Sequence, residues 1–85
     1  MRISFYDRRM EKTIYSTTYR TLILWLKECR EAKGLTMREL AQQLEVAHSW
    51  VGKVEQMERR LDVFEYVRLC ECLDVNPALG LKKLQ

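Results

Sequence analysis

The chain has 85 residues, of which 47% are apolar and 32% charged, and its formal net charge is +3 at pH 7. A chain of this length forms one domain and buries only about 60–65% of the surface that it exposes when unfolded, which excludes a deep enclosed active site. No apolar run approaches the roughly 20 residues of a membrane helix, and charges near the start argue against a signal peptide, so we expect a cytoplasmic protein with no membrane partner.

Residues 1–17 form an extension whose structure the sequence does not decide. Ile3 and Phe5 alternate with polar residues, as in a short strand, whereas the following "DRRMEKTIY" could begin a helix. Three interpretations stay open: a frayed extension, a basic arm on DNA, and a segment that forms a dimer. The basic residues that would serve such an arm are Arg2, Arg8, Arg9 and Lys12.

Two helices with clear end signals are predicted next. The first is expected over 18–33, where apolar residues recur at helical spacing and Gly34 provides a stop. The second is expected over 36–44, because Thr36 and Glu39 have the spacing of a capping box. Each helix has one apolar face, as expected for elements that pack around a shared core.

A connection of only three residues, "EVA", leads to a third helix over 47–56. Val46, Val51 and Val54 are expected to face the core. Two short helices joined by so short a turn have the geometry of a helix-turn-helix.

The remaining sequence predicts two more helices. One spans 62–73, with Asp62 as its cap and Glu65 as the cap's partner. Its expected inward stripe is Phe64, Val67, Cys70 and Leu73. The last helix starts at Asn76 and Pro77, with Leu81 and Leu84 on one side. The fold class is therefore all-α: a compact bundle of about five helices in residues 18–85.

The outward face of the helix over 47–56 has an unusual composition for a solvated surface. It consists of His48, Ser49, Gly52, Lys53 and Gln56. Lysine reaches the acceptors of guanine, while serine and histidine can donate or accept hydrogen bonds at base edges. This face is thus a candidate for reading double-stranded DNA, and a merely exposed face is the alternative.

Two residues of this helix allow two interpretations each. Gly52 costs about 1 kcal/mol against alanine in a helix interior, yet a missing side chain would let the backbone approach a groove wall or a phosphate closely. Trp50 could pack partly against the core or stack on a base, and packing is the commoner role. For Gly52 we favour a close approach of the helix backbone to DNA, and for Trp50 we favour packing against the core.

Cations flank the candidate helix. Arg59 and Arg60 follow it in "QMERRLD", where contacts to phosphate would fix its position on DNA without reading sequence. The start of the helix over 36–44 offers free backbone N–H groups and the positive end of a helix dipole, with Arg38 adding charge. A solvated charged loop is the alternative for the two arginines.

Other chemistry is not indicated by the sequence. Cys29, Cys70 and Cys72 form no CxxC pair, and a single histidine cannot complete a tetrahedral zinc site. No nucleophile–histidine arrangement, paired carboxylates or glycine-rich phosphate loop is recognisable. We therefore expect no enzyme activity, no metal and no cofactor.

One long segment resembles a known family. Residues 26–77, "LKECREAKGLTMRELAQQLEVAHSWVGKVEQMERRLDVFEYVRLCECLDVNP", are similar to the Cro and phage-repressor type of helix-turn-helix domain, the XRE family. The resemblance rests on "GLTMRELAQQL", the valines of "VAHSWVGKVE", Glu55, "ERRLD" and "LDVNP", in this order. It implies a lambda-repressor-like five-helix bundle that binds DNA as a two-fold dimer, with the second helix of the motif in the major groove.

The resemblance also implies roles for individual residues. The base-reading positions are His48, Ser49, Gly52 and Lys53, and the phosphate-side positions are Thr36, Met37, Gln56, Arg59 and Arg60. An arginine late in the first helix pairs in this family with a glutamate that ends the third, which here implies a structural ion pair between Arg30 and Glu55.

Three residues depart from the family pattern. Met37 stands where glutamine is usual, so a side-chain hydrogen bond towards the DNA backbone is missing. Glu45 stands at the usual glycine of the turn, at a cost of about 1 kcal/mol or more if φ is positive there. Ala47 replaces the usual serine or threonine cap and removes one hydrogen bond at the helix start.

The expected function is sequence-specific DNA-binding regulation of transcription. The simplest form is a repressor that binds a palindromic operator as a homodimer through the helix over 47–56. The alternative is a protein-interaction module of the same fold, such as the antitoxin of a toxin–antitoxin pair. Apolar residues of the N-terminal extension would support a protein partner, namely Ile3, Phe5, Met10, Ile14 and Tyr15.

Overall fold

A computed structural model describes residues 17–85, and the interpretations of the preceding residues fall outside this described part. The elements are α2 (Thr17–Ala32), α3 (Met37–Leu44), α4 (His48–Glu55), α5 (Val63–Leu73), α6 (Pro77–Leu81) and the 3-10 helix η3 (Lys82–Leu84). All regular structure within residues 17–85 is helical, which confirms the predicted all-α bundle of about five helices.

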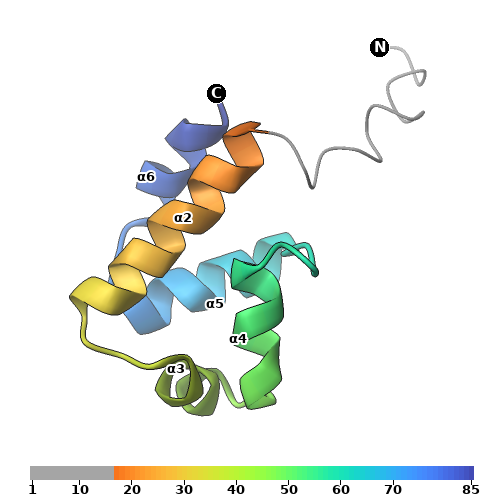
Figure 1. The fold of residues 1–85 in the computed structure, drawn as a ribbon. Helices are drawn as coiled ribbons and strands as arrows, with labels where there is room; N and C mark the ends of the chain where they lie inside the picture. Colours follow the sequence, from red (N-terminus) through yellow and green to blue (C-terminus); the bar gives the residue numbers. More distant parts are fainter. Residues whose placement is uncertain (1–16) are drawn as a thin grey trace.

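α2 runs along the length of the domain and contacts elements at both of its ends (Figure 1). The start of α2 lies beside η3 and the C-terminus, while α3 and α4 pack against each other at the opposite end. α5 lies behind α2 in this view and contacts both α3 and α6. No helix within residues 17–85 has the length and apolar character that crossing a membrane requires.

The predicted end signals are all present. Thr36 Oγ1 accepts a hydrogen bond from the Glu39 amide at 3.0 Å, and Glu39 Oε1 accepts one from the Thr36 amide at 2.8 Å. Asp62 and Glu65 form the same reciprocal capping box at the start of α5. The remaining signals are the Asn76 side chain, which accepts from the Ala78 amide, Pro77 at the first helical position, and Gly34 with φ of 77° after α2. Local side-chain chemistry therefore determines most of the helix boundaries.

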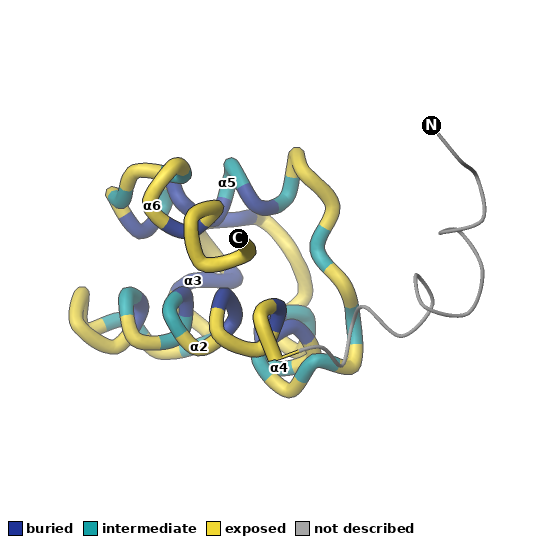
Figure 2. Tube along the Cα trace, turned by 90° about the horizontal axis from the view of Figure 1, so that it is seen from above, coloured by how far each residue is buried: buried dark blue, intermediate teal, exposed yellow. Residues whose placement is uncertain are grey.

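The core lies where α2 and α5 meet the pair α3 and α4. Its buried aliphatic residues are Leu22, Ile23 and Leu26 of α2, Leu40 and Leu44 of α3, Val51 and Val54 of α4, and Leu69 and Leu73 of α5. Figure 2 shows these buried turns on the inner sides of the helices and exposed turns outside. Each fully buried leucine contributes roughly 1.5–3 kcal/mol, so these contacts supply most of the stabilisation.

The prediction that Phe64 faces the core is wrong. Its side chain is 68% exposed, while the buried stripe of α5 consists of Tyr66, Leu69, Cys70 and Leu73. The predicted stripe advanced in steps of three residues, and each step turns the direction by about 300° rather than 360°. Phe64 and Leu73 consequently point to opposite sides of α5.

Val46 also differs from the prediction, because its side chain is exposed. It belongs to the turn before α4 and not to the helix, so the helical spacing of Val51 and Val54 does not extend to it. Its amide donates to the Ala41 carbonyl at 3.0 Å, which ties the turn to α3 while the side chain points away from the core.

Gly80 permits a close approach between helices. A Cβ atom at this position would collide with the Tyr66 hydroxyl and with the ring of Trp25. The Tyr66 hydroxyl donates a 2.5 Å hydrogen bond to the Pro77 carbonyl, and burial raises the pKa of Tyr66, which keeps the hydroxyl protonated. Gly80 thus lets α6 pack closely against α2 and α5.

Candidate nucleic-acid interface

The turn between α3 and α4 is closed by backbone hydrogen bonds. Glu45 adopts the left-handed conformation, with φ of 61° and ψ of 43°, and its amide donates to the Ala41 and Gln42 carbonyls. The family usually has glycine at this position of the turn. Glu45 adopts the positive φ that such a turn requires, although it has a side chain. Ala47 precedes α4 and provides no side-chain cap, as predicted.

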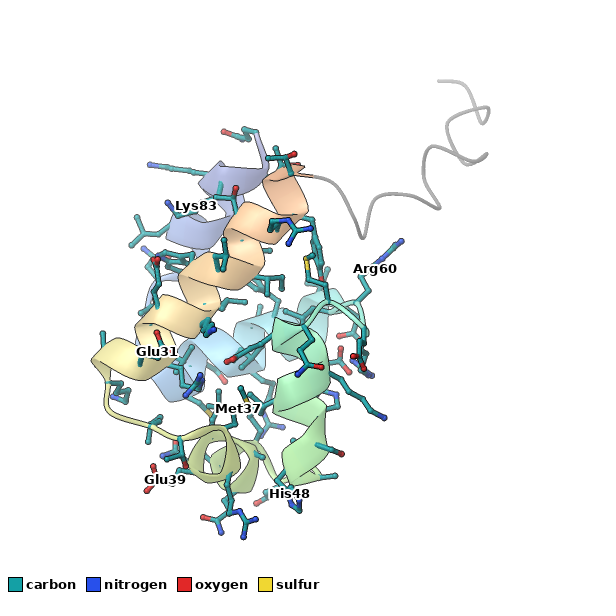
Figure 3. The ribbon with its side chains drawn as sticks, viewed as in Figure 1. Glu31, Met37, Glu39, His48, Arg60 and Lys83 are labelled. Atoms are coloured by element: carbon teal, nitrogen blue, oxygen red, sulfur yellow. The ribbon has the colours of Figure 1, made fainter. Side chains whose placement is uncertain are left out.

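α4 has a buried side and an exposed side. Val51 and Val54 are buried in the core. The residues left exposed are His48, Ser49, Lys53 and Gln56, and Gly52 is half-buried. Figure 3 shows His48 at the free end of α4, directed away from the body of the molecule. The exposed set provides hydrogen-bond donors and acceptors and one cation along a single helix.

Gly52 lies against α3 rather than only against solvent. A Cβ added to it would be 3.7 Å from the Met37 Sδ, an ordinary van der Waals distance. Nothing in residues 17–85 therefore requires glycine for steric reasons at this position.

Met37, the first residue of α3, packs its partly buried side chain against the core on the side of α4 (Figure 3). Its thioether is thus engaged in packing, and only its backbone N–H at the start of α3 is suited to an anion. The amides of the first helical turn lack partners within any α-helix, which makes this end electropositive. Thr36 and Arg38 are exposed beside it.

Arg59 and Arg60 have different surroundings. Arg59 donates to both carboxylate oxygens of Glu65 at 2.8 Å, and its guanidinium lies 5.3 Å from the centroid of the Trp50 ring. The hydrogen bonds from Arg59 lower the pKa of Glu65. Arg60 is exposed, extends away from the body in Figure 3, and forms no ion pair within the described part of the chain.

Trp50 is half-buried against the core under Arg59. Its position agrees with the packing interpretation. An indole held between the core and a guanidinium is not free to stack on a base. Trp50 and Arg59 together connect α4 to the loop that carries Arg60.

Arg30 and Glu55 form a buried ion pair. Arg30 Nε lies 2.7 Å from Glu55 Oε2 and Nη2 lies 3.1 Å from Oε1, and each side chain is only 8% exposed. Arg30 Nη1 also donates to the Leu35 carbonyl at 2.7 Å. Hydrogen bonding to Glu55 raises the pKa of Arg30, so the guanidinium stays charged. These contacts join the end of α2, the loop before α3 and the end of α4.

Comparison with known proteins agrees with this geometry. Residues 25–79 match the family model described as a helix-turn-helix domain. The chain belongs to the XRE-type helix-turn-helix family. It is similar to a solved structure described as an XRE-family like protein from Pseudomonas syringae pv. tomato str. DC3000, with 41% identity, a TM-score of 0.77, and coverage of 88% of this chain and 92% of that chain. No curated protein matches the chain.

Sequence reasoning missed part of the arrangement around this helix-turn-helix. Glu65 was assigned only as the partner of the Asp62 cap, but it also binds Arg59. The contact joins residues six apart across a loop, a separation that no helical or strand rule associates with contact. The role of the Leu35 carbonyl as an acceptor for Arg30 likewise had no sequence signal.

Proposed function

We propose that this protein is a sequence-specific regulator of transcription that binds double-stranded DNA by inserting α4 into the major groove. The observation that carries the proposal is the two-sided character of α4 in a helix-turn-helix chain. Val51 and Val54 fix one side in the core, and the polar residues His48, Ser49 and Lys53 are left exposed on the other.

Base reading would come from the exposed side of α4. Lys53 suits the O6 and N7 acceptors of guanine, Ser49 suits either donors or acceptors, and His48 lies at the helix end that would enter the groove first. Gly52 would let the backbone of α4 approach the groove wall. Each specific contact of this kind contributes roughly 1–3 kcal/mol of discrimination against a wrong base.

Phosphate contacts would supply much of the affinity and fix the register. Thr36, Arg38, Gln56 and Arg60 are exposed. Met37 would offer its backbone N–H at the start of α3. Arg59 would contribute mainly by holding the loop, because Glu65 already binds the end of its guanidinium. Such contacts release counterions, so affinity should fall steeply with salt.

The protein would act as a homodimer on a palindromic operator. In helix-turn-helix dimers the two reading helices meet half-sites one turn of DNA apart, about 34 Å. A dimer bound across a promoter would exclude polymerase, which is the simplest form of repression.

The experiment is a titration of fluorescent operator DNA, found by selection from random duplexes, against scrambled DNA of equal length at several salt concentrations. The proposal predicts a palindromic selected site, two chains per duplex, and tighter binding to the site at every salt concentration. Equal affinity for both duplexes without salt dependence would refute it. A promoter–reporter fusion then separates repression from activation by the direction of the change.

A protein-interaction module is the second candidate, and the exposure of Phe64 favours it. Phe64, Val46 and Trp50 line a depression of about 240 Å³ beside α4. Glu65 and Arg68 also line it. An exposed aromatic residue in such a depression suits a protein partner. A stoichiometric partner that stays bound without DNA and is lost in Phe64→Ser would establish this function.

A further inference from the structure

An apolar groove of about 250 Å³ lies between α2, the start of α5 and the C-terminal residues. Its aliphatic lining residues are Leu22, Leu61, Val63, Val67, Leu81 and Leu84. Val63 is 80% exposed, Leu81 49% and Leu84 42%. Exposed aliphatic side chains clustered around one groove indicate a surface that binds an apolar segment.

The described part of the chain begins near this groove, at Thr17. Thr17 begins α2, and Tyr19, two residues later, accepts a hydrogen bond on its hydroxyl from the Leu61 amide at 3.3 Å. Leu22, on the same face of α2 as Tyr19, lines the groove itself. The first turn of α2 is therefore attached to the edge of the groove.

The length of chain before Thr17 is sufficient to reach the groove. Ile14 is three residues before Thr17, and an extended chain spans at most about 3.3–3.6 Å per residue, so Ile14 lies within roughly 10 Å of the start of α2. Met10 and Tyr15 are the neighbouring apolar residues.

The charge of the N-terminal residues is complementary to that of the groove. The charged residue among those lining the groove is Asp62, which is acidic. Residues 1–16 contain four basic residues and two acidic ones, a net charge of +2. A basic segment with apolar residues close to Thr17 therefore suits both the groove and its edge.

We propose that residues 10–15 of the same chain cover this groove, with the Ile14 side chain inserted between α5 and the C-terminal residues. A tethered segment competes at a high effective concentration, of millimolar order for short flexible links, which favours it over the same segment of a second molecule. Covering the groove would also hold Leu61, and with it the loop that carries the adjacent Arg60. The proposal does not depend on DNA binding.

The test is methyl nuclear Overhauser spectroscopy on the full chain, with isoleucine, leucine and valine methyl groups labelled. The proposal predicts contacts between the Ile14 δ1 methyl and methyl groups of Val63 or Leu84. The same contacts should be absent from an isotope-filtered spectrum of mixed labelled and unlabelled chains. Contacts seen only in the filtered spectrum would mean that residues 10–15 of a second copy occupy the groove. The absence of all contacts would mean that residues 10–15 do not occupy it. Either result overturns the proposal.

Matched variants test the same contact through stability. Ile14→Ala and Val63→Ala should each lower the urea midpoint, and the double variant should lower it by less than the sum of the two, independently of protein concentration. Ile3→Ala is the control, because Ile3 lies outside the proposed segment, and it should leave the midpoint unchanged. Strictly additive effects of Ile14→Ala and Val63→Ala would overturn the proposal.

Discussion

The guanidinium of Arg59 donates two hydrogen bonds to the carboxylate of Glu65, each 2.8 Å long. Glu65 at the same time accepts a hydrogen bond from the Asp62 amide at 3.0 Å as part of the capping box of α5. One carboxylate thus fixes both the start of α5 and the loop that follows α4. The loop holding Arg60 is positioned by this contact.

The Glu65 contact predicts a pH dependence of stability. Because the folded-state pKa of Glu65 is lowered from its ordinary value of 4.5, its contribution is present above that value and is lost as the pH falls through the folded-state pKa. Glu65→Gln keeps an acceptor for the cap and should cost about 0.5–1 kcal/mol at pH 7, since Arg59 is partly exposed. Urea unfolding at pH 7 and below pH 4 measures the difference. A cost that stays constant between the two pH values would contradict the ionic contribution.

Arg59 and Arg60 should differ in their effects on DNA binding. Arg60→Ala removes a free cation and should lower the salt dependence of binding by about one counterion, with equal weakening for all DNA sequences. Arg59→Ala should chiefly lower the free energy of unfolding, because it breaks the contact to Glu65. Titrations at four salt concentrations, with unfolding measured in parallel, compare the two variants. Equal salt slopes for both would show that Arg59 contacts phosphate as well.

Gly52→Ala separates the folding role of this glycine from its proposed DNA role. The added Cβ has room beside Met37, so the free energy of unfolding should rise by up to about 1 kcal/mol from improved helix propensity. If α4 approaches DNA closely at Gly52, affinity for the operator should nevertheless fall. Urea unfolding and DNA titration of one preparation give both values. A more stable variant with unchanged affinity would show that the missing side chain serves no close approach.

Glu45→Gly should stabilise the turn between α3 and α4. Glu45 has φ of 61°, where a residue with a Cβ is strained by about 1–2 kcal/mol, but glycine also makes the unfolded chain more flexible. We expect a net gain of up to about 1 kcal/mol in the free energy of unfolding. Glu45→Ala is the matched control and should give no such gain, because alanine retains the Cβ. Equal stability of the two variants would contradict strain at this residue.

Local signals in the sequence predicted much of the fold. The capping pairs at Thr36 and Asp62 act within one helical turn, so their residue types and spacing are sufficient to locate the starts of α3 and α5. Gly34 and Asn76 similarly mark ends through their own backbone or side chain. The ends of these helices are predictable because the residues that determine them are close to one another in the sequence.

Features decided by tertiary contacts were predicted less well. Phe64 and Val46 were assigned to the core from apolar spacing, but the direction of each depends on how α5 and the turn sit on their neighbours. The bond from Arg59 to Glu65 crosses a loop whose path the sequence does not specify. The need for glycine at residue 80 likewise depends on Tyr66 and Trp25, neighbours that only the folded chain brings to it.

The candidate site was predicted from composition and from the family resemblance together. The exposed residues of α4 could be selected because Val51 and Val54 had to face inwards. The roles of these residues on DNA remain predictions, since they depend on a partner. Met37 shows the difference: its position in the motif suggests a phosphate contact, whereas its partly buried side chain packs against the core.

Lys53→Ala tests the central claim, that α4 reads DNA sequence, most directly. The measurement is the ratio of affinities for the selected operator and for operators with single changes at each guanine, for the native chain and the variant. We predict that Lys53→Ala loses about 1–3 kcal/mol of discrimination at one base pair of each half-site, while Lys82→Ala, a charge-matched control at the other end of the molecule, changes no ratio. Uniform weakening of every operator by Lys53→Ala, with all ratios preserved, would contradict base reading by this helix.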